Sequence, residues 1–315
     1  MVERRPRRPV DGELVEITPS YVDVWGRTRE LDSQTHAALL RALGPKSAVR
    51  KVSFPVGKCH QPEVLLQGGR VWGFALQLYG LRSARNWGIG DFGDLRVVVE
   101  QAAKLGAGII GLNPLHATGM SPYSPSSRYA LNPLYIDLQG PGPKRLRDTE
   151  LVDYAAVRKA KYAAFESIFK KISFTEKLQT KALRDFGVFE ALREELGEDW
   201  RRWPDEYLGP ASPAVKRFAT KHARRVGFHA WLQVRAREQL DAVQARALKL
   251  GMPVGLYVDL ALGADRGGAE VWSDPDAYAM TVSTGAPPDE FNPRGQDWGL
   301  PPYSPRALRA SGYRP

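Results

Sequence analysis

Two short apolar segments on either side of an amphipathic helix constrain the fold of this chain more than any other feature. Residues 71–79 (VWGFALQLY) and 107–115 (AGIIGLNPL) predict buried strands, and residues 93–106 (GDLRVVVEQAAKLG) predict the helix between them. We expect Asp94 to cap this helix and its inner face to consist of Leu95, Val98, Val99, Ala102 and Leu105. A strand, a helix and a strand within 45 residues predict a parallel β-α-β unit.

A long helix and a third strand extend this pattern. Residues 226–251 predict the helix, and residues 253–262 (PVGLYVDLAL) predict the strand. Residues 141–212 predict a helical insertion after the second strand, and large insertions at this position are typical of β/α barrels. The apolar stripe of the long helix recurs mostly at spacings of three and four, and consists of Phe228, Trp231, Leu232, Ala236, Leu240, Val243 and Ala247.

The rest of the chain predicts less regular structure. Residues 1–70 are expected to form a basic tail, over residues 1–12, and a short N-terminal region with one helix at 33–44, capped by Ser33. Residues 71–315 are the expected barrel portion. We expect residues 263–305 to be rich in loops, because nothing after the third strand predicts a further helix and strand.

Composition and charge exclude several classes of protein. The single cysteine, Cys59, excludes an internal disulfide and a multi-cysteine metal site. We expect neither a membrane span nor a secretory signal, since long apolar runs are absent, and we therefore expect a cytoplasmic location. The formal net charge is +10, but the basic residues are scattered and no nucleic-acid-binding motif accompanies them. A solvated basic surface is therefore favoured over a nucleic-acid partner.

The glycine-rich residues 88–93 (GIGDFG) match the pattern G-x-G-x-x-G. A dinucleotide site needs these glycines directly after a strand, whereas eight residues separate Tyr79 from Gly88. A glycine-rich loop that leads into a capped helix is therefore favoured. His60 and His116 have no second histidine or acid at metal-ligand spacing, so structural histidines are favoured over metal ligands.

A segment rich in tyrosine, serine and proline occupies residues 121–138 (SPYSPSSRYALNPLYIDL). Aromatic side chains with polar tips suit the C–H faces and hydroxyl edges of sugars, and prolines reduce the cost of ordering a loop. Ordinary packing of a proline-rich loop is the alternative, and it explains Tyr135 well. The candidate sugar contacts are Tyr123, Tyr129 and Tyr135 with Ser121, Ser124 and Asn132, and residues 295–299 (GQDWG) add Gln296 and Trp298.

Asp259 lies in the C-terminal half of the third predicted strand. A carboxylate near the end of a buried strand is costly unless it is paired or functional, and in a barrel this position faces the ligand. The sequence leaves two roles open: a contact with a ligand, or a cap or ion pair with a basic residue such as Arg266.

Four longer stretches carry a specific pattern: LQLYGLRSARNWGIGDFGDL, IIGLNPLHA, SPYSPSSRYALNPLYIDL, and the residues from GLYVDLALGADRGGAEVWSDPDAY to GAPPDEFNPRGQDWGLPPYSP. Together they closely resemble bacterial amylomaltases, a family of 4-alpha-glucanotransferases, over residues 71–315. The resemblance implies an α-amylase-like (β/α)8 (TIM) barrel, of which this chain forms the first part. It also implies transfer of α-1,4-glucan segments between maltodextrins, with retention and without a metal or an organic cofactor.

The same resemblance assigns substrate contacts by position. Ser121 and Tyr123 match the S-P-Y loop of the family, and Asn132 matches its N-P-L/Y turn. Asp259 matches the aspartate at its third strand, and Gln296 and Trp298 match its G-Q-x-W-G loop. The expected ligands are α-1,4-glucan oligosaccharides. The six positions are Ser121, Tyr123, Asn132, Asp259, Gln296 and Trp298.

One departure from the family determines what chemistry we expect. The nucleophilic aspartate of the family lies in an R-I-D-H-like motif, followed by an acid/base glutamate and a third aspartate, and none of these motifs occurs in this sequence. A retaining transfer needs two carboxyl groups about 5–5.5 Å apart. We therefore expect no catalytic residue and an incomplete barrel in this chain, which a complementary chain would complete, as in one half of a split enzyme. The alternative is a non-catalytic maltodextrin-binding protein.

Overall fold

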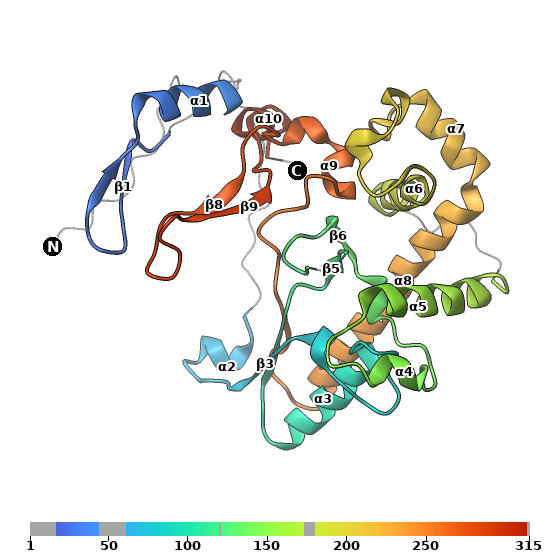
Figure 1. Cartoon of the computed structure of the whole chain (residues 1–315). Coiled ribbons are helices and arrows are strands. Elements are labelled where there is room, and N and C mark those ends of the chain that lie inside the picture. Colours follow the sequence, from blue (N-terminus) through green and yellow to red (C-terminus); the bar gives the residue numbers. More distant parts are fainter. Residues whose placement is uncertain (1–16, 44–60, 120, 173–179, 314–315) are drawn as a thin grey trace. The chain divides into compact units, whose positions relative to one another are not determined.

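A computed structural model describes residues 17–43, 61–119, 121–172 and 180–313 of the chain (Figure 1). The expectations for the basic tail, Cys59 and His60 lie outside the described residues. The chain divides into two compact units, Gly57–Ser273 and the pair of segments Met1–Val56 and Asp274–Pro315. The boundaries between these units do not coincide with residue 70. The expected domains 1–70 and 71–315 concern which residues belong to the barrel, and this division stays a prediction.

The larger unit contains a parallel sheet of three short strands. They are β3 (Gly73–Leu76), β4 (Ile109–Leu112) and β7 (Gly255–Val258), and β4 lies between the other two. The parallel β-α-β unit and the third parallel strand predicted from the sequence are therefore confirmed. Each strand is shorter than its apolar segment; after β3, for example, the chain turns into the 3-10 helix η1 (Leu78–Gly80).

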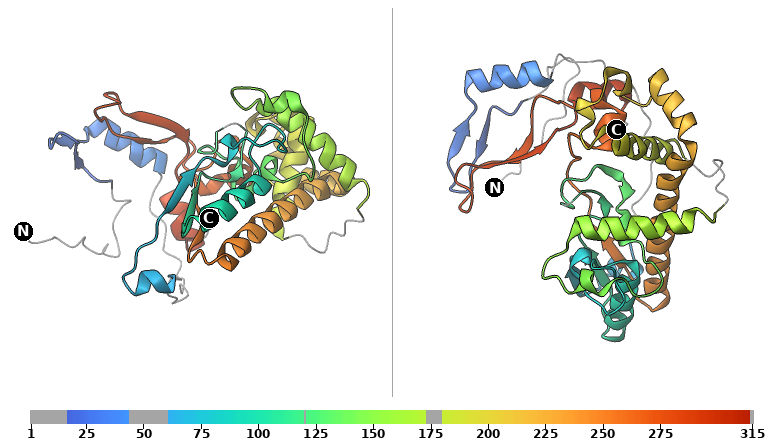
Figure 2. Two further views of the ribbon diagram at one scale, coloured as in Figure 1. Left: turned by 90° about the horizontal axis from the view of Figure 1, so that it is seen from below. Right: turned by 45° about the vertical axis from the view of Figure 1, so that its right-hand side comes forward.

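Two helices cover one face of this sheet. α3 (Phe92–Lys104) and α8 (Ala223–Lys249) pack side by side, as Figure 2 also shows. The predicted apolar stripe of α8 is confirmed, because all seven of its residues are buried. On α3 the prediction is wrong for Leu105, which is 67% exposed at the C-cap. The buried contacts of the sheet with α3 and α8 include Leu95, Val99, Ile110, Leu112, Leu240 and Val243.

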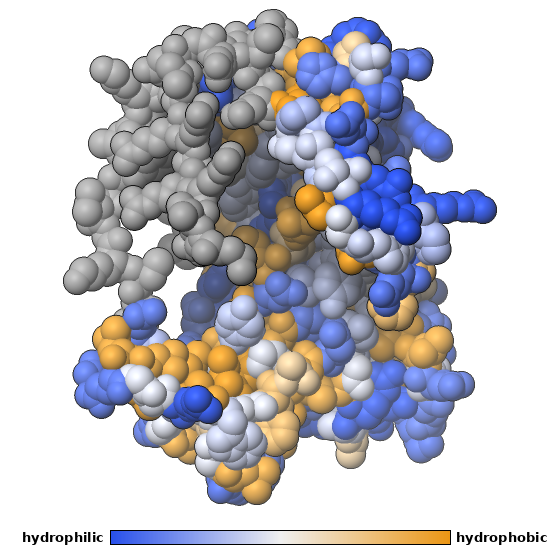
Figure 3. Space-filling view, turned by 90° about the vertical axis from the view of Figure 1, so that its left-hand side faces the viewer, coloured by the Kyte–Doolittle hydropathy of each residue, from blue (hydrophilic) through white to orange (hydrophobic). Residues whose placement is uncertain are grey.

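The first strand is not buried as expected. Gly73, Phe74 and Ala75 of β3 are all exposed among the described residues, and Phe74 keeps 44% of its surface accessible. β3 is an edge strand of the described sheet, so helix packing covers only part of it. Figure 3 shows the side of the molecule where α2 (Glu63–Leu66) lies. Apolar surface is extensive in the lower half of this view. Exposed apolar residues of α2 and the segment around β3 include Leu65, Leu66, Trp72 and Phe74.

The chain between β4 and β7 begins with an antiparallel hairpin that the sequence did not predict. Its strands are β5 (His116–Ala117) and β6 (Ser127–Leu131), and η2 (Pro133–Tyr135) follows them. Helices then dominate, and those from α4 to η5 fall within the expected insertion at 141–212. The described helices between η2 and α8 are α4 (Lys144–Arg147), α5 (Tyr154–Phe169), α6 (Lys181–Leu196), η4 (Trp200–Arg202), η5 (Asp205–Tyr207) and α7 (Pro213–Lys221).

The end of the larger unit packs on this helical layer through aromatic side chains. α9 (Ala269–Ser273) contacts α6, and the Trp272 ring lies 5.5 Å from Phe189 and 6.2 Å from Trp203 between ring centroids. The Trp272 indole N–H donates to the Tyr207 carbonyl oxygen over 2.8 Å. These contacts hold α9, which follows β7 by ten residues, against the helices between η2 and α8.

The smaller unit contains two antiparallel hairpins and three short helices in its described residues. The first hairpin pairs β1 (Ser20–Val22) with β2 (Thr28–Glu30), and the second pairs β8 (Thr284–Ala286) with β9 (Gln296–Leu300). Most of residues 263–305 lie outside helices and strands, as expected, although the sequence did not predict this second hairpin or α9. The helices are α1 (Ser33–Leu43), η6 (Pro275–Ala277) and α10 (Pro305–Ser311).

The N-cap expected for the first helix is also wrong by one residue. Ser33 is the first residue of α1, whereas Asp32 Oδ1 accepts a hydrogen bond from Thr35 N over 2.8 Å. Asp32 Oδ2 accepts from the Thr35 hydroxyl over 2.6 Å. An aspartate immediately before the first helical residue satisfies a free backbone donor, which is the function of an N-cap.

Candidate functional site

Two of the predicted contact segments follow neighbouring strands of the parallel sheet. The β5–β6 hairpin comes after the carboxyl end of β4, and Asp259 comes directly after β7. Parallel strands present their carboxyl ends at one edge of a sheet, where the ligand sites of α/β folds are commonly found. The sheet topology thus directs both segments to the same edge of the larger unit.

The segment of residues 121–138 presents two of its three tyrosines to solvent. Tyr123 is 53% exposed and Tyr129 is 55% exposed, whereas Tyr135 is buried. Tyr135 packs in the core and its hydroxyl accepts a hydrogen bond from Asn113 Nδ2 over 3.3 Å, and burial raises its pKa. Packing therefore accounts for Tyr135, and a sugar contact by Tyr123 or Tyr129 stays a prediction that their exposure permits.

Local hydrogen bonds fix the turn that carries Ser121 and Tyr123. The Thr118 hydroxyl donates to Ser121 O over 2.6 Å, Tyr123 N donates to Ser121 Oγ over 3.3 Å, and Ser126 N donates to Ala117 O over 2.7 Å. Ser121 itself is exposed. A turn held in this way loses little conformational entropy when a ligand binds, which favours a preorganised contact surface.

Asn132 shapes the chain after the hairpin. Its side chain is buried, and its Oδ1 accepts a hydrogen bond from Leu134 N over 3.0 Å at the start of η2. Its backbone N–H donates to Leu115 O over 2.9 Å. These bonds give Asn132 a part in forming the turn, and a direct contact with a ligand stays a prediction.

Asp259 differs from the expectation in its burial. β7 ends at Val258, and the Asp259 side chain is exposed beyond it rather than buried in the sheet. The cost of burying a carboxylate, which motivated its selection from the sequence, therefore does not apply. Exposure leaves Asp259 accessible to a ligand, and this role stays a prediction.

His116 has the structural role that the sequence favoured. It is buried, and its Nε2 accepts a hydrogen bond from Ala261 N over 3.3 Å. No cluster of three or more histidine, cysteine, aspartate or glutamate side chains suited to a metal ion is found among the described residues.

Gln296 and Trp298 form a pair on the β8–β9 hairpin of the smaller unit. They lie two residues apart on β9, so their side chains point to the same face of the hairpin. Both are exposed, and Trp298 Nε1 donates to Gln296 Oε1 over 3.1 Å. This bond orients the indole ring while 40% of the Trp298 surface stays accessible. Contact of this pair with a glucan stays a prediction.

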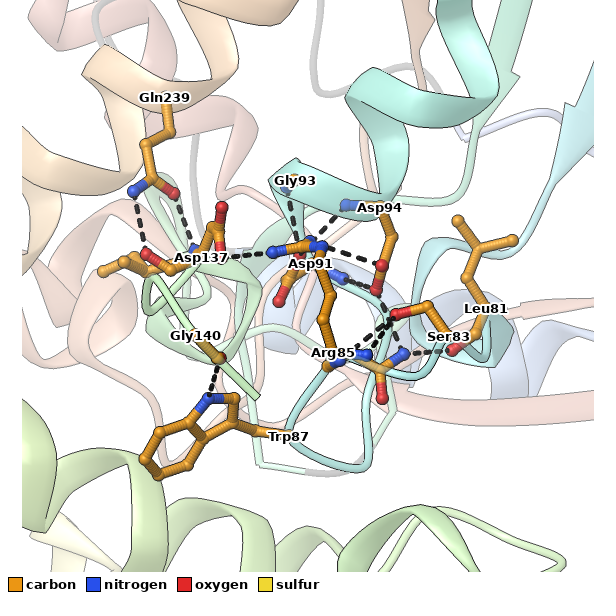
Figure 4. Close-up of polar contacts among 12 residues, drawn as sticks. Leu81, Ser83, Arg85, Trp87, Asp91, Gly93, Asp94, Asp137, Gly140 and Gln239 are labelled. Atoms are coloured by element: carbon orange, nitrogen blue, oxygen red, sulfur yellow. Dashed lines mark hydrogen bonds and ion pairs between the residues drawn. The ribbon is translucent and has the colours of Figure 1, made fainter. Parts of the chain in front are cut away.

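The structure reveals a charged cluster beneath the glycine-rich loop that the sequence did not indicate (Figure 4). One terminal nitrogen of Arg85 donates to Asp137 Oδ1 over 2.7 Å, and the other contacts Asp91 Oδ1 at 2.7 Å and Asp94 Oδ1 at 3.3 Å. Asp137 lies near the end of the tyrosine-rich segment, and its backbone exchanges two hydrogen bonds with the Gln239 side chain on α8. Arg85 thus ties the glycine-rich loop to the segment that carries the tyrosines.

A buried lysine completes this cluster. Lys161 on α5 is fully buried, and its Nζ donates to Leu134 O over 2.6 Å and to Ile136 O over 2.8 Å. Burial lowers the pKa of Lys161 to about 8, against the opposing effect of three aspartates that include Asp91. Burial also raises the pKa of Asp91, and Lys161 opposes that shift.

The glycine-rich loop serves packing and helix capping. The N-cap of α3 is Asp91 rather than the predicted Asp94; its side chain accepts from Gly93 N and Asp94 N, and the Asp94 side chain accepts from Asp91 N. A Cβ atom at Gly90 would lie 2.0 Å from Leu78 O, too close for any larger residue. These contacts agree with a loop that leads into a capped helix, which was favoured over a dinucleotide site.

Residues 76–315 match the family model described as 4-alpha-glucanotransferase. The chain belongs to this 4-alpha-glucanotransferase family. The resemblance to amylomaltases drawn from the sequence motifs is therefore confirmed.

Individual relatives of the 4-alpha-glucanotransferase family agree with this result. A 4-alpha-glucanotransferase of Haemophilus influenzae is 39% identical over 305 residues, which cover 81% of this chain and 44% of the relative. One of Mycobacterium tuberculosis is 38% identical over 290 residues, which cover 79% of this chain and 40% of the relative. The chain thus spans less than half the length of these two curated relatives.

Solved structures of amylomaltases share the fold. That from Corynebacterium glutamicum has a TM-score of 0.63 and 30% identity, and the match covers 79% of this chain and 38% of that one. That from Streptococcus agalactiae in complex with acarbose has a TM-score of 0.66 and 21% identity, and covers 78% and 55% respectively. The α/β fold is therefore shown, whereas the extent of the barrel is not. None of the described helices has the length and apolarity needed to cross a membrane.

Proposed function

We propose that this chain binds α-1,4-glucan oligosaccharides and forms the glucan-binding part of a 4-alpha-glucanotransferase. The observation that carries the proposal is the exposure of Tyr123 and Tyr129 on a hairpin whose turn is held by its own hydrogen bonds. The family membership and the exposed pair Gln296 and Trp298 support it. Such rings can pack on the C–H faces of glucose units while neighbouring polar groups bond to the hydroxyls. We assign ligand contacts to Ser121 and Asp259 on the same grounds.

The reaction that we propose for the complete assembly is transfer of α-1,4-glucan segments with retention, without a metal or an organic cofactor. It requires a nucleophilic carboxylate and an acid/base carboxyl group about 5–5.5 Å apart. We assign neither to a residue of this chain. In our proposal, residues beyond this span or a complementary chain supply both groups and the remaining strands of a (β/α)8 barrel. A cytoplasmic location stays a prediction.

The transfer part of the proposal predicts that the 315-residue chain does not disproportionate maltotriose. Without both carboxyl groups, the chain can bind and position a glucan but cannot form or hydrolyse a glycosyl intermediate. The measurement is chromatography of glucose and longer dextrins after incubation of the pure chain with maltotriose. Efficient formation of these products would show that the chain contains its own catalytic carboxylates.

The binding part of the proposal predicts that Trp298→Ala weakens maltoheptaose binding about tenfold or more. Removing an aromatic ring that covers a sugar loses about 1.5–3 kcal/mol, and 1.4 kcal/mol corresponds to a factor of ten. Isothermal titration calorimetry gives the dissociation constants. Trp25→Ala is the matched control, because Trp25 is also an exposed tryptophan of the smaller unit, near β1. Equal affinities of the two variants would remove Trp298 from the site.

A further inference from the structure

The turn of the β5–β6 hairpin is joined to the segment that follows Asp259. Asp265 N donates to Pro125 O over 2.7 Å, and Glu270 N donates to Ser126 O over 2.9 Å. The Ser126 hydroxyl accepts from Ala269 N over 3.0 Å. A Cβ atom at Gly268 would lie 2.5 Å from Ser126 O, so the two backbones approach each other as closely as glycine permits. Figure 1 shows the hairpin close to the chain that runs from β7 to α9.

An ion pair between side chains reinforces this junction. The Arg128 Nε donates to Glu270 Oε1 over 3.1 Å, and the Arg128 backbone N–H donates to Glu270 Oε2 over 2.7 Å. A terminal nitrogen of Arg128 also donates to Leu262 O over 3.3 Å. Only 13% of the Arg128 side chain and 3% of the Glu270 side chain are exposed. Water therefore competes little for these bonds, and bonds between charged groups of this kind are the stronger ones.

His116 makes a third attachment on the side nearer to Asp259. Its Nε2 accepts from Ala261 N, two residues after Asp259, so the ring is neutral and carries its proton on Nδ1. The pKa of His116 is lowered, chiefly because the ring is buried, and the Arg128 charge lowers it further. The charges of Glu270 and Asp259 and a hydrogen bond to the Arg128 backbone act in the opposite direction. At neutral pH the ring can therefore accept the bond from Ala261. Protonation would place two donors opposite each other and break it.

We propose that Glu270, with Arg128 and His116, positions the Tyr123-bearing turn against the Asp259-bearing segment at the separation that a glucan requires. This inference rests on the proposed glucan binding and adds residues that need not touch the sugar themselves. Glu270 accepts bonds from Arg128 of the hairpin and lies on α9, which the Trp272 indole attaches to the helical layer. The three residues therefore connect both contact segments to the helical layer.

Glu270→Gln tests this positioning in the complete chain. The variant loses the charge that holds Arg128, so we expect amide hydrogen exchange at residues 118–128 to become about tenfold faster and the maltoheptaose dissociation constant to rise about tenfold. Glu100→Gln is the matched control, because it removes an ion pair with Arg246 between α3 and α8. It should change neither quantity. Arg128→Lys, which keeps the charge but loses the planar fork, should resemble Glu270→Gln and replaces it if that variant does not fold.

A pH profile separates positioning from general stabilisation. We expect the affinity of the parent chain for maltoheptaose to be steady above about pH 6.5 and to fall as the pH decreases through the lowered pKa of His116. His116→Gln has a side chain that accepts hydrogen bonds without titrating, and its affinity should be flat from pH 7 to about pH 5. Glu100→Gln should follow the parent profile.

Two results would overturn the inference. One is unchanged loop exchange and unchanged affinity in Glu270→Gln, and the other is a pH profile of His116→Gln identical to that of the parent chain. If the parent chain does not bind maltoheptaose at all, the proposed function fails. In that case exchange at residues 118–128 in Glu270→Gln still shows whether Glu270 holds the turn.

Discussion

Replacing Arg85 by glutamine is expected to lower the free energy of unfolding by about 3 kcal/mol at neutral pH. Removing one partner of a buried ion pair costs about 3–5 kcal/mol, and the lower end applies because a third of the Arg85 side chain is exposed. Asp91 and Asp94 are almost completely buried, and both contact Arg85. Without this cation their negative charges repel each other in a site that water cannot solvate well.

The effect of Arg85→Gln should depend on pH in a definite direction. Burial raises the pKa of Asp91, and Arg85 is one of the groups that oppose this rise. In the variant that pKa rises further, so Asp91 takes up a proton earlier as the pH falls and the repulsion is relieved. The difference in stability between parent and variant should therefore shrink as the pH decreases from neutral into the acidic range.

Urea unfolding at several pH values measures both effects of Arg85→Gln. Arg82→Gln is the matched control, since Arg82 lies in the same loop, is exposed, and its hydrogen bond to Tyr79 O is long, at 3.5 Å. It should change the free energy of unfolding by less than about 0.5 kcal/mol. A difference for Arg85→Gln that stays constant or grows at acidic pH would contradict the role of Asp91.

The parallel strands and the long helix could be predicted from the sequence because their signals are local. Seven apolar residues at helical spacing defined α8, and all seven are buried. The cap of α3 was misassigned because two aspartates, Asp91 and Asp94, stand three residues apart and both take part in the capping box. Only the backbone conformation tells which of them lies outside the helix: Asp91 has a φ of −130° and a ψ of 178°.

The connections that organise the candidate site could not be predicted in the same way. Arg85 and Asp137 are 52 residues apart, and Arg128 and Glu270 are 142 apart. Nothing in a local pattern pairs them, because the pairing results from how the sheet and helices bring the segments together. The β5–β6 hairpin escaped prediction for another reason: β5 has only two residues, too few for an alternating pattern. The six contact residues were predicted from the motif resemblance. Five of them are exposed in the structure, and the sixth, Asn132, is buried.

Lys161→Met is the second change with a large expected effect. The lysine donates to two buried carbonyl oxygens, Leu134 O and Ile136 O, and interacts with the aspartates around Arg85. Methionine fills a similar volume but cannot donate, so both carbonyl oxygens lose their partner inside the protein. Each unsatisfied group costs about 1–3 kcal/mol, and we expect the free energy of unfolding to fall by about 3–4 kcal/mol at pH 7.

The pH dependence of this loss distinguishes a buried titrating lysine from a simple packing defect. The pKa of Lys161 is lowered from 10.5 to about 8, so between these values the unfolded chain holds a proton that the folded chain has released. Stability from this group therefore rises with pH across that window, by about 3 kcal/mol in total. Lys161→Met cannot follow this rise, and its deficit relative to the parent chain should widen from pH 8 to about pH 10. Urea unfolding measures it, with Lys159→Met, an exposed position on the same helix, as the control. A deficit that stays constant with pH would mean that Lys161 is not the titrating group.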